Sequence, residues 1–450
     1  MYTDNDDVYD VVVVGAGIAG LYVAEQSAAR GERVLVLERN GYLGGRVFTH
    51  PTHKYECGAA RFHDSHTRLK SLLRKYKLKT FPLPTQYDYL AQHDREKMAD
   101  ANHYFDEQTK AFVKRLKMKT WSTSTLMDQT MHEACRKAFP RDEHDALRLW
   151  TDVFGYTSEV RTLNAYDAMR TFDEEFVGKR FHVVGGGLSQ LIRCLEKDIK
   201  RRGGRVETGA TVRDIVHHKY DDDDGKLTDA FEVHASFKSQ SKTRKGKGKG
   251  KEKEKETRSL YARKCVLAIP PKAMMSIPYV KRNVGASTLS AVKGEPLLRI
   301  YAQYAKNKDN GPEGGAVWFQ GLRRTTTDSF LRHIIPIDEK SGMIMVSYTD
   351  GIDTKPFAKG ETHVKRLVHD ELRALFPERD VPEPRYFKMH LWPDGAYYWR
   401  AGSDSRVLSK RMVQPVDGVP LYTCGEGFSM KQAWMEGALE TADDVLRALR

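Results

Sequence analysis

The pattern of apolar and polar residues is most distinctive near the start of the chain. Residues 9–14 read Tyr-Asp-Val-Val-Val-Val, an apolar and β-branched run that is typical of a parallel strand covered on both faces. A glycine turn follows, and then a helical pattern over 18–30 that ends at Gly31. A second apolar strand over 33–37 closes the pattern. This order predicts a β-α-β unit.

The pattern changes twice along the rest of the chain. Residues 64–180 are rich in charged residues and leucine and poor in glycine, which predicts a mostly helical block. Residues 276–400 show alternating strand patterns and one helix near 363–375, and the last fifty residues return to a strand, a glycine-rich turn and a helix. Between these parts we expect one helix and three short strands, at 188–202, 205–216, 231–237 and 264–269.

These elements predict an α/β fold with two domains. Pieces typical of a nucleotide-binding domain occur three times, so we expect a Rossmann-like dinucleotide-binding domain built from 1–63, 181–270 and 401–450. Residues 64–180 and 271–400 are expected to form a second, mixed α+β domain. With 40% apolar and 10% aromatic residues among 450, the chain can bury a sizeable core.

Charge is unevenly distributed along the chain. The formal net charge is +13, and residues 238–258 alone hold ten Lys and Arg against three Glu. The surrounding segment 220–258 is therefore predicted to be a low-complexity, disordered insertion in the first domain. Contact of the 238–258 loop with nucleic acid or another polyanion is the less favoured interpretation, because the run has no aromatic residue to stack a base.

Cysteines and targeting signals indicate where the protein resides. Five scattered cysteines predict neither a disulfide framework nor a C-x-x-C pair. The N-terminal stretch is acidic, which argues against a secretory signal, and no apolar run reaches the ~18 residues that cross a bilayer. We expect a soluble, intracellular protein with no membrane partner, cytoplasmic unless the lysine-rich run acts as a nuclear address.

A glycine motif lies at the turn between the first strand and the first helix. Gly15, Gly17 and Gly20 form G-x-G-x-x-G, in which the first glycine makes the turn, the second lets a pyrophosphate approach, and the third lets helix and strand pack closely. Glu38 lies 18 residues after Gly20, where a carboxylate can bind both ribose hydroxyls and repel a 2′-phosphate. The sequence therefore predicts a dinucleotide site.

A second glycine pair suggests which dinucleotide is bound. Gly44 and Gly45 let an extended cofactor approach the backbone, and Arg46 can neutralise a phosphate with two hydrogen bonds. Together with Glu38 and Arg39, these residues resemble the FAD fingerprint of the flavin amine oxidase superfamily. That group includes monoamine oxidases, polyamine oxidases, L-amino-acid oxidases and related desaturases.

The resemblance extends over most of the chain. Segment 57–61 resembles the part of the family that runs beside the flavin ring, the glycines at 185–187 its second FAD segment, and segments 424–426 and 433–438 its C-terminal signature. The resemblance implies a flavoprotein with an FAD-binding first domain and a substrate-binding second domain. The further residues implied at FAD are Gly58, Ala59, Ala60, Arg61, Val212, Gly425, Glu426, Trp434, Met435 and Ala438.

The resemblance also implies a catalytic site. Tyr397 resembles the tyrosine of the family's Gly-x-Tyr turn, so Tyr397 and Trp434 are expected to form two walls of an aromatic cage that attracts an amine; alternatively, both are core aromatics. Ala396 stands where monoamine oxidases carry the cysteine that tethers FAD, which implies non-covalent FAD. Arg299 stands at the family's catalytic lysine position, where an arginine can equally serve as an ion-pair partner at a strand edge.

The expected function is FAD-dependent oxidation of the C–N bond of a mono-, di- or polyamine to an imine, with O₂ as acceptor and release of H₂O₂. Arg61, followed by His66, resembles the arginine that grips the substrate carboxylate in L-amino-acid oxidases, so amino-acid oxidation is one alternative. Desaturase-type or isomerase-type FAD chemistry is another. A flavoprotein that binds a partner through its lysine-rich loop is the third.

No metal is expected. Five potential ligands gather in one stretch, but without an H-E-x-x-H or paired C-x-x-C spacing. They are His50, His53, Cys57, His63 and His66.

Overall fold

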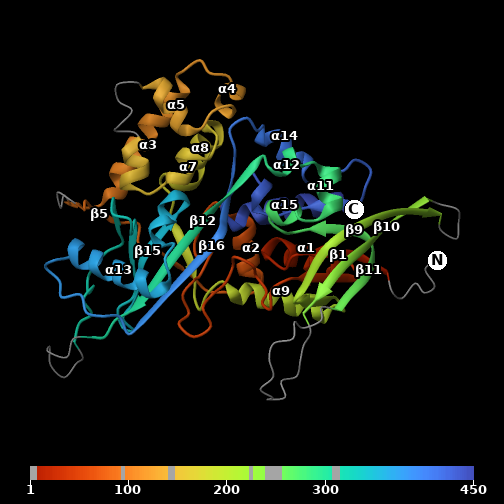
Figure 1. Cartoon of the computed structure of the whole chain (residues 1–450), viewed down its shortest axis with the longest axis horizontal. Coiled ribbons are helices and arrows are strands. Elements are labelled where there is room, and N and C mark those ends of the chain that lie inside the picture. Colours follow the sequence, from red (N-terminus) through yellow and green to blue (C-terminus); the bar gives the residue numbers. More distant parts are fainter. Residues whose placement is uncertain (1–7, 93–96, 140–146, 222–226, 239–255, 307–314) are drawn as a thin grey trace.

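The computed structural model describes residues 8–92, 97–139, 147–221, 227–238, 256–306 and 315–450. Two seven-stranded sheets form the two halves of the molecule, and the long strands β12 and β16 run toward the junction between them (Figure 1). A helical block lies over the second sheet. No helix in these residues is long and apolar enough to cross a membrane.

The first sheet has the strand order β8-β2-β1-β11-β10-β9, with β17 also paired to β11. The pairs β1–β2, β1–β11, β2–β8 and β11–β17 are parallel, whereas β9, β10 and β11 form an antiparallel meander. Its strands are β1 (Val8–Val14), β2 (Val34–Glu38), β8 (Arg205–Thr208), β9 (Ala210–Asp221), β10 (Leu227–Phe237), β11 (Glu256–Leu267) and β17 (Leu421–Thr423).

The centre of this sheet is buried on both faces, as the valine run predicts. Val11 and Val13 lie in a core cluster with α1 (Ile18–Ala29), α9 (Ser189–Arg201) and α15 (Met435–Ala448), whereas Val12 and Val14 lie in a cluster on the opposite side. The predicted β-α-β unit is thereby confirmed. The strands β1, β2 and β11 end at the same edge of the sheet, because Val14 of β1 pairs with Leu37 of β2 and with Leu267 of β11.

The second sheet has the order β16-β12-β15-β14-β13-β5-β6 and is antiparallel except for the β13–β5 pair. Its apolar face packs against α13 (Glu361–Leu375) through Val364, Val368 and Leu372. Its strands are β5 (Asp88–Leu90), β6 (Lys97–Met98), β12 (Val292–Gln303), β13 (Thr325–Thr327), β14 (His333–Asp338), β15 (Met343–Asp350) and β16 (Tyr386–Trp399).

The block from 64 to 180 is mainly helical, as predicted. Trp150, Phe154 and Phe172 are fully buried and fill its core. Its helices are α2 (Thr67–Lys75), α3 (Ala101–Lys117), α4 (Thr123–Met127), α5 (Met131–Ala138), η1 (Leu149–Val153), α7 (Thr157–Arg161), α8 (Ala165–Thr171) and η2 (Phe172–Phe176).

Several short elements complete the described fold. A three-stranded sheet joins the start of the helical block to the glycine turn before α9, and consists of β3 (Phe62–His63), β4 (Thr80–Pro82) and β7 (Phe181–Val184). The remaining helices are α10 (Pro271–Met274), α11 (Pro278–Val284), α12 (Ala286–Leu289), η3 (Gly351–Phe357), α14 (Ser405–Arg411) and η4 (Glu426–Phe428).

The strand expected at 231–237 is confirmed as part of β10, and the expectation of disorder over 220–258 is wrong for residues 220–221, 227–230 and 256–258, which extend β9, β10 and β11. Phe231, Val233 and Ala235 alternate with polar residues and bury one face of β10 in the core, which stabilises the hairpin. The lysine-rich stretch 239–255 lies outside the described residues. The division into two domains at the stated boundaries stays a prediction.

Candidate active site

A cavity of about 520 Å³ lies between the two sheets. At one end it is lined by the glycine turn after β1, and at the other by residues of β12, β14 and β15. Almost all residues expected at FAD line it. They are Gly15, Gly17, Glu38, Arg39, Gly44, Gly45, Arg46, Gly58, Ala59, Ala60, Arg61, Val212, Gly425, Glu426, Trp434, Met435 and Ala438.

The three glycines of the first motif differ in what surrounds them. Gly15 has φ +104°, and a Cβ there would lie 2.5 Å from the carbonyl oxygen of Ala268. A Cβ on Gly17 would meet no atom within 4 Å, so this glycine leaves open space at the N-terminus of α1. Gly20 does not line the cavity; its Cβ would lie 2.1 Å from the Gly15 oxygen, which fits the packing role expected for it.

Glu38 lies at the end of β2, where it lines the cavity. Its carboxylate accepts a hydrogen bond from the backbone N–H of Ala16 (2.9 Å) and another from that of Asn40 (2.8 Å). These bonds fix the carboxylate, and each oxygen keeps a further lone pair for a ligand hydroxyl group. The geometry fits the ribose of an adenine dinucleotide.

Arg46 connects the FAD end of the cavity with the second sheet. Its guanidinium forms an ion pair with Glu426 (2.6 Å) and donates to the carbonyl oxygen of Gly395 (3.0 Å). Both Arg46 and Glu426 line the cavity, as expected of FAD contacts. A Cβ at Gly58 would lie 2.0 Å from the Arg46 oxygen, so the segment beside the expected flavin ring needs glycine there.

The helix α15 begins at the cavity. Trp434 is its N-cap residue, and Met435 and Ala438 line the cavity from its first turn. The N-terminus of a helix carries a partial positive charge, which favours a developing negative charge on a bound ring. Together with Glu38, the glycines and the N-terminus of α1, this arrangement fits FAD bound in an extended conformation.

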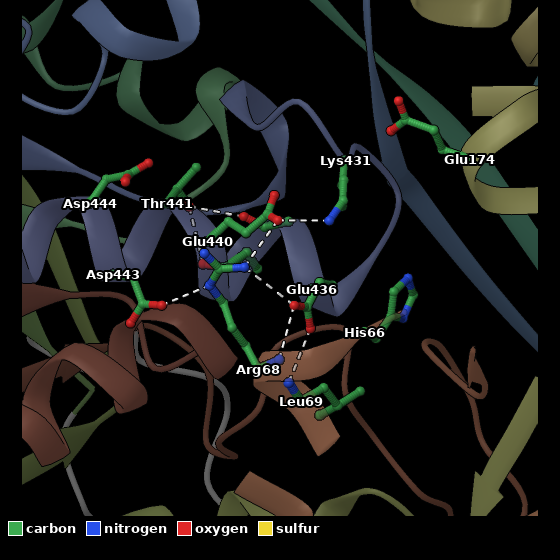
Figure 2. Close-up of polar contacts among 12 residues, drawn as sticks. His66, Arg68, Leu69, Glu174, Lys431, Glu436, Glu440, Thr441, Asp443 and Asp444 are labelled. Carbon is green, nitrogen blue, oxygen red and sulfur yellow. Dashed lines mark hydrogen bonds and ion pairs between the residues drawn. The ribbon is translucent and has the colours of Figure 1, made fainter. Parts of the chain in front are cut away.

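A cluster of ion pairs holds α15 against α2 (Figure 2). Glu436 is fully buried and accepts hydrogen bonds from the first backbone N–H groups of α2 (both 3.0 Å). The guanidinium of Arg68 forms ion pairs with Glu440 (3.1 Å) and Asp443 (2.7 Å), one and two turns further along α15 than Glu436. The cluster fixes the position of the helix end that carries Trp434.

Two histidines and a glutamate lie behind Trp434. Glu175 accepts hydrogen bonds from Nε2 of His63 (2.8 Å) and of His66 (3.1 Å), and both rings contact the edge of the Trp434 ring system. Burial alone would raise the pKa of Glu175, but the hydrogen bonds from His63 and His66 bring it to about 2. The sequence did not indicate that Glu175, which is more than 100 residues away, would join the histidines.

These three residues could also hold a cation, since their donor atoms lie within 4.8 Å of one another. The hydrogen bonds already occupy Nε2 of both His63 and His66. The arrangement is therefore explained as a hydrogen-bonded support for the indole of Trp434. The expectation of no metal stays a prediction.

The structure places Tyr397 outside the cavity. Ala396 and Tyr398 line the cavity, whereas Tyr397, 2% exposed, is not among the lining residues; its ring packs beside Gly427, and its centroid lies 6.0 Å from the guanidinium of Arg46. The cage expected from Tyr397 and Trp434 is therefore not assembled with Tyr397. The Gly-x-Tyr motif indicates a turn, but it does not determine which of two adjacent tyrosines faces inward.

Arg61 lies in the cavity with its guanidinium over the ring of Phe181, 4.3 Å from the centroid. Among the described residues no carboxylate forms an ion pair with it. Burial lowers the pKa of Arg61, and the neighbouring guanidinium of Arg324 lowers it further. Since a guanidinium keeps its proton at neutral pH, Arg61 presents an unpaired positive charge to the cavity.

Arg299 lies on β12 and is 8% exposed. Its guanidinium stacks over the Tyr348 ring at 4.8 Å, and its Nε atom has no hydrogen-bond partner within the described structure. Burial alone would lower the pKa of Arg299, but nearby Tyr301 and Tyr348 raise it. In the part of the chain that the structure describes, Arg299 forms no ion pair with a carboxylate, and its catalytic role stays a prediction.

Sequence reasoning missed a further basic pair at this end of the cavity. Arg324 packs over the ring of Tyr87 at 4.9 Å, and its Nη2 lies 3.5 Å from Nδ1 of His333. Burial lowers the pKa of His333 well below its ordinary value, and Arg324 lowers it further. His333 is therefore neutral. Both residues line the cavity, but no local motif surrounds either of them.

Three carboxylates missed by sequence reasoning also line the cavity wall. Glu159 accepts from the Tyr398 hydroxyl (3.1 Å), and Asp350 from that of Ser158 (2.6 Å). Glu295 accepts from Thr162 (2.6 Å) and pairs with a lysine at the same distance. Burial raises the pKa of Glu159 to about 7 and that of Asp350 well above its usual range, so this wall carries little negative charge.

The fold and cavity define a class of protein. A parallel sheet with a glycine cradle, an acid at the ribose position and a cavity that continues into a second domain-sized sheet form an FAD-dependent oxidoreductase. Residues 18–446 match the family described as flavin containing amine oxidoreductase. The chain belongs to this family and is a flavoprotein of the amine oxidase type.

Amino-acid oxidases are among the curated proteins that the chain resembles in sequence. Flavin-dependent L-tryptophan oxidase RebO of Lentzea aerocolonigenes is 24% identical, over 98% of this chain and 97% of that protein. Aplysianin-A of Aplysia kurodai is 22% identical, over 98% of this chain and 90% of that protein. An L-amino-acid oxidase of Mus musculus is 43% identical, but the match covers only 17% of this chain and 13% of that relative.

Solved structures show the same fold. Putrescine oxidase bound to putrescine superposes with a TM-score of 0.70 at 16% identity, covering 98% of this chain and 99% of that one. Cyclohexylamine oxidase from Brevibacterium oxydans IH-35A gives a TM-score of 0.71 at 17% identity, with 98% of both chains covered. The predicted α/β two-domain flavoprotein fold is thereby confirmed.

Proposed function

We propose that the protein oxidises the α-amino group of an L-amino acid, with O₂ as electron acceptor and H₂O₂ as product, and that Arg61 binds the substrate carboxylate. The observation that carries the proposal is the unpaired guanidinium of Arg61 in the cavity. A guanidinium forms two parallel hydrogen bonds with a carboxylate, which would orient the substrate as well as hold it. The L-tryptophan oxidase among the relatives supports this choice.

Bound FAD supplies the acceptor for a hydride equivalent from the carbon that carries the nitrogen. The protein's task is to hold that carbon in place and to exclude water. Arg61 anchors the carboxylate, Trp434 and Tyr398 provide aromatic walls, and the N-terminus of α15 faces the same space. Arg299 contributes a second fixed positive charge to the cavity.

Oxidation of a diamine or polyamine is a second candidate function. The carboxyl groups of Glu159 and Asp350 favour it, because they line the cavity, have raised pKa values and would be ionised by a bound ammonium group. It is ranked second because Tyr397, expected in the aromatic cage, lies outside the cavity.

The test measures peroxide release by the purified flavoprotein with L-amino acids, diamines and monoamines as substrates. We expect turnover of amino acids, with a KM that rises about 100-fold in Arg61→Gln because a buried charge pair is lost. Arg366→Gln, an exposed arginine on α13, is the matched control and should behave like the wild type. Turnover of amines alone, unaffected by Arg61→Gln, would contradict the proposal and favour the second candidate.

A further inference from the structure

Arg324 is a third guanidinium, after Arg61 and Arg299, that lines the same cavity without an acidic partner among the described residues. It comes from the segment before β13, so it approaches from a different element than Arg61. Its Nε atom is buried and has no hydrogen-bond partner. The guanidinium of Arg324 lies over the Tyr87 ring, 4.9 Å from its centroid, and this contact uses none of the N–H groups that could bind a ligand.

His333 orients Arg324 without neutralising it. Nδ1 of His333 lies 3.5 Å from Nη2 of Arg324, within reach as a hydrogen-bond acceptor. His333 is buried, and its ring also contacts Tyr348 at 5.4 Å between centroids, so it is held on both sides. A neutral imidazole that accepts a hydrogen bond from one Nη atom fixes the orientation of the guanidinium plane. It leaves the positive charge uncompensated.

The surrounding charges do not compensate Arg324 either. The adjacent Arg332 is paired with Asp353 (3.2 Å), so Asp353 is already used. Glu159 and Asp350, which also line the cavity, already accept hydrogen bonds from Tyr398 and Ser158, and within the described residues neither forms an ion pair with an arginine. This end of the cavity therefore has an excess of positive charge.

We propose that Arg324 forms a second anion subsite, and that the amino acid oxidised is one with a carboxylate side chain. The inference rests on the proposed function, in which Arg61 takes the α-carboxylate. A side-chain carboxylate would receive charge-assisted hydrogen bonds from the fork of Arg324. The amide side chain of glutamine or asparagine has the same shape but offers one acceptor oxygen and an NH₂ group that faces the guanidinium. These amino acids should therefore bind less tightly.

The experiment compares kcat/KM for L-glutamate and L-aspartate with that for L-glutamine, L-asparagine and L-lysine, by peroxide release from the holoenzyme. We expect the acidic substrates to be preferred over their amides by about 100-fold. Arg324→Gln should abolish that preference by lowering kcat/KM for the acidic substrate, with L-glutamine changed less than about threefold. Arg323→Gln is the matched control, since Arg323 is outside the cavity lining and pairs with Asp88 and Asp100.

A binding measurement separates this inference from the proposed function. Glutarate, which cannot be oxidised by amine chemistry, should raise the melting temperature of the wild-type holoenzyme more than that of Arg324→Gln, whereas butanoate, with a single carboxylate for Arg61, should raise both equally. If glutarate binds through Arg324 but no amino acid is oxidised, the subsite stands and the proposed function fails. If amino acids are oxidised with glutamine equal to glutamate, or with lysine preferred, the proposed function stands and the acidic-substrate inference is overturned.

Discussion

At the scale of single residues, Glu175 supports the indole of Trp434 indirectly. It receives hydrogen bonds from His63 and His66, and all three side chains are buried. The two imidazole rings transmit this restraint to Trp434 through edge contacts at 5.5 and 4.9 Å between centroids. A carboxylate that is deeply buried and doubly hydrogen-bonded makes folding stability depend on pH.

The sign of this dependence follows from the lowered pKa. Folding lowers the pKa of Glu175 from 4.5 to about 2, so its stabilisation is complete above about pH 4.5 and is lost as the pH falls toward 2. Burial lowers the pKa of His63, which acts in the same direction below pH 6.5. We expect the free energy of unfolding to fall between pH 5 and 3 by about 1–2 kcal/mol more in the wild type than in Glu175→Gln.

Urea unfolding at several pH values measures this difference. Glu174→Gln is the control, because Glu174 is half-exposed and pairs only with Arg170 on the helix surface. If Glu175→Gln and the wild type lose stability in parallel over this range, Glu175 does not carry the charge assigned to it.

How far the sequence predicts the site can be argued from these residues. Gly15, Glu38 and Arg46 were found because their roles depend on spacing within one continuous β-α-β segment. Arg324 and His333 could not be found that way, because they reach the cavity only through pairing in the second sheet. Tyr397 was misplaced because the inward face of β16 depends on register, and a shift of one residue exchanges the two faces.

At the scale of elements, the contact between α2 and α15 decides where the cavity wall lies. Glu436 has no exposed surface and satisfies two backbone N–H groups at the start of α2, while Arg68 spans three acids of α15. Such a buried carboxylate cannot be replaced by water, because the helix end is closed off from solvent.

We expect Glu436→Gln to lower the free energy of unfolding by about 2–4 kcal/mol, because one backbone N–H group and the Arg68 guanidinium lose a charged acceptor. Glu440→Gln, at a partly exposed position of the same cluster, should cost less than about 1 kcal/mol. Chemical denaturation of both variants checks this ranking. Equal losses would show that the cluster acts only as a surface ion-pair network.

The elements themselves were largely predictable where the pattern of apolar residues was strong. The valine run of β1 and the amphipathic pattern of α13 place both elements within two residues of their observed bounds. The strand β10 extends four residues before its predicted start, into a segment assigned to disorder. There, pairing with β9 and β11 overrides a polar local composition.

At the scale of the whole molecule, FAD joins parts of the chain that are far apart in sequence. The cavity is lined by the turn after β1, by Val212 of β9, and by Gly425 and Met435 near the C-terminal end. A ligand that binds only the folded state stabilises it by about 4 kcal/mol when present at a thousand times its Kd. We therefore expect removal of FAD to lower the melting temperature by about 4–5 °C, given the entropy of unfolding of a chain of this length.

Differential scanning calorimetry of the apoprotein and of the protein reconstituted with FAD checks this expectation. AMP, which offers only the adenosine end, should restore part of the loss through Glu38. A melting temperature that does not change on removal of FAD would mean that the cofactor does not connect the segments that line the cavity.

The measurement that tests the central claim most directly is the reductive half-reaction, followed without oxygen by stopped-flow absorbance of the bound flavin. On mixing with an L-amino acid, the wild type should bleach with a rate that saturates, and Arg61→Gln should need about 100-fold more substrate for the same rate. Bleaching by diamines alone, with the same concentration dependence in both proteins, would contradict the account and show that the arginine in the cavity does not bind the substrate.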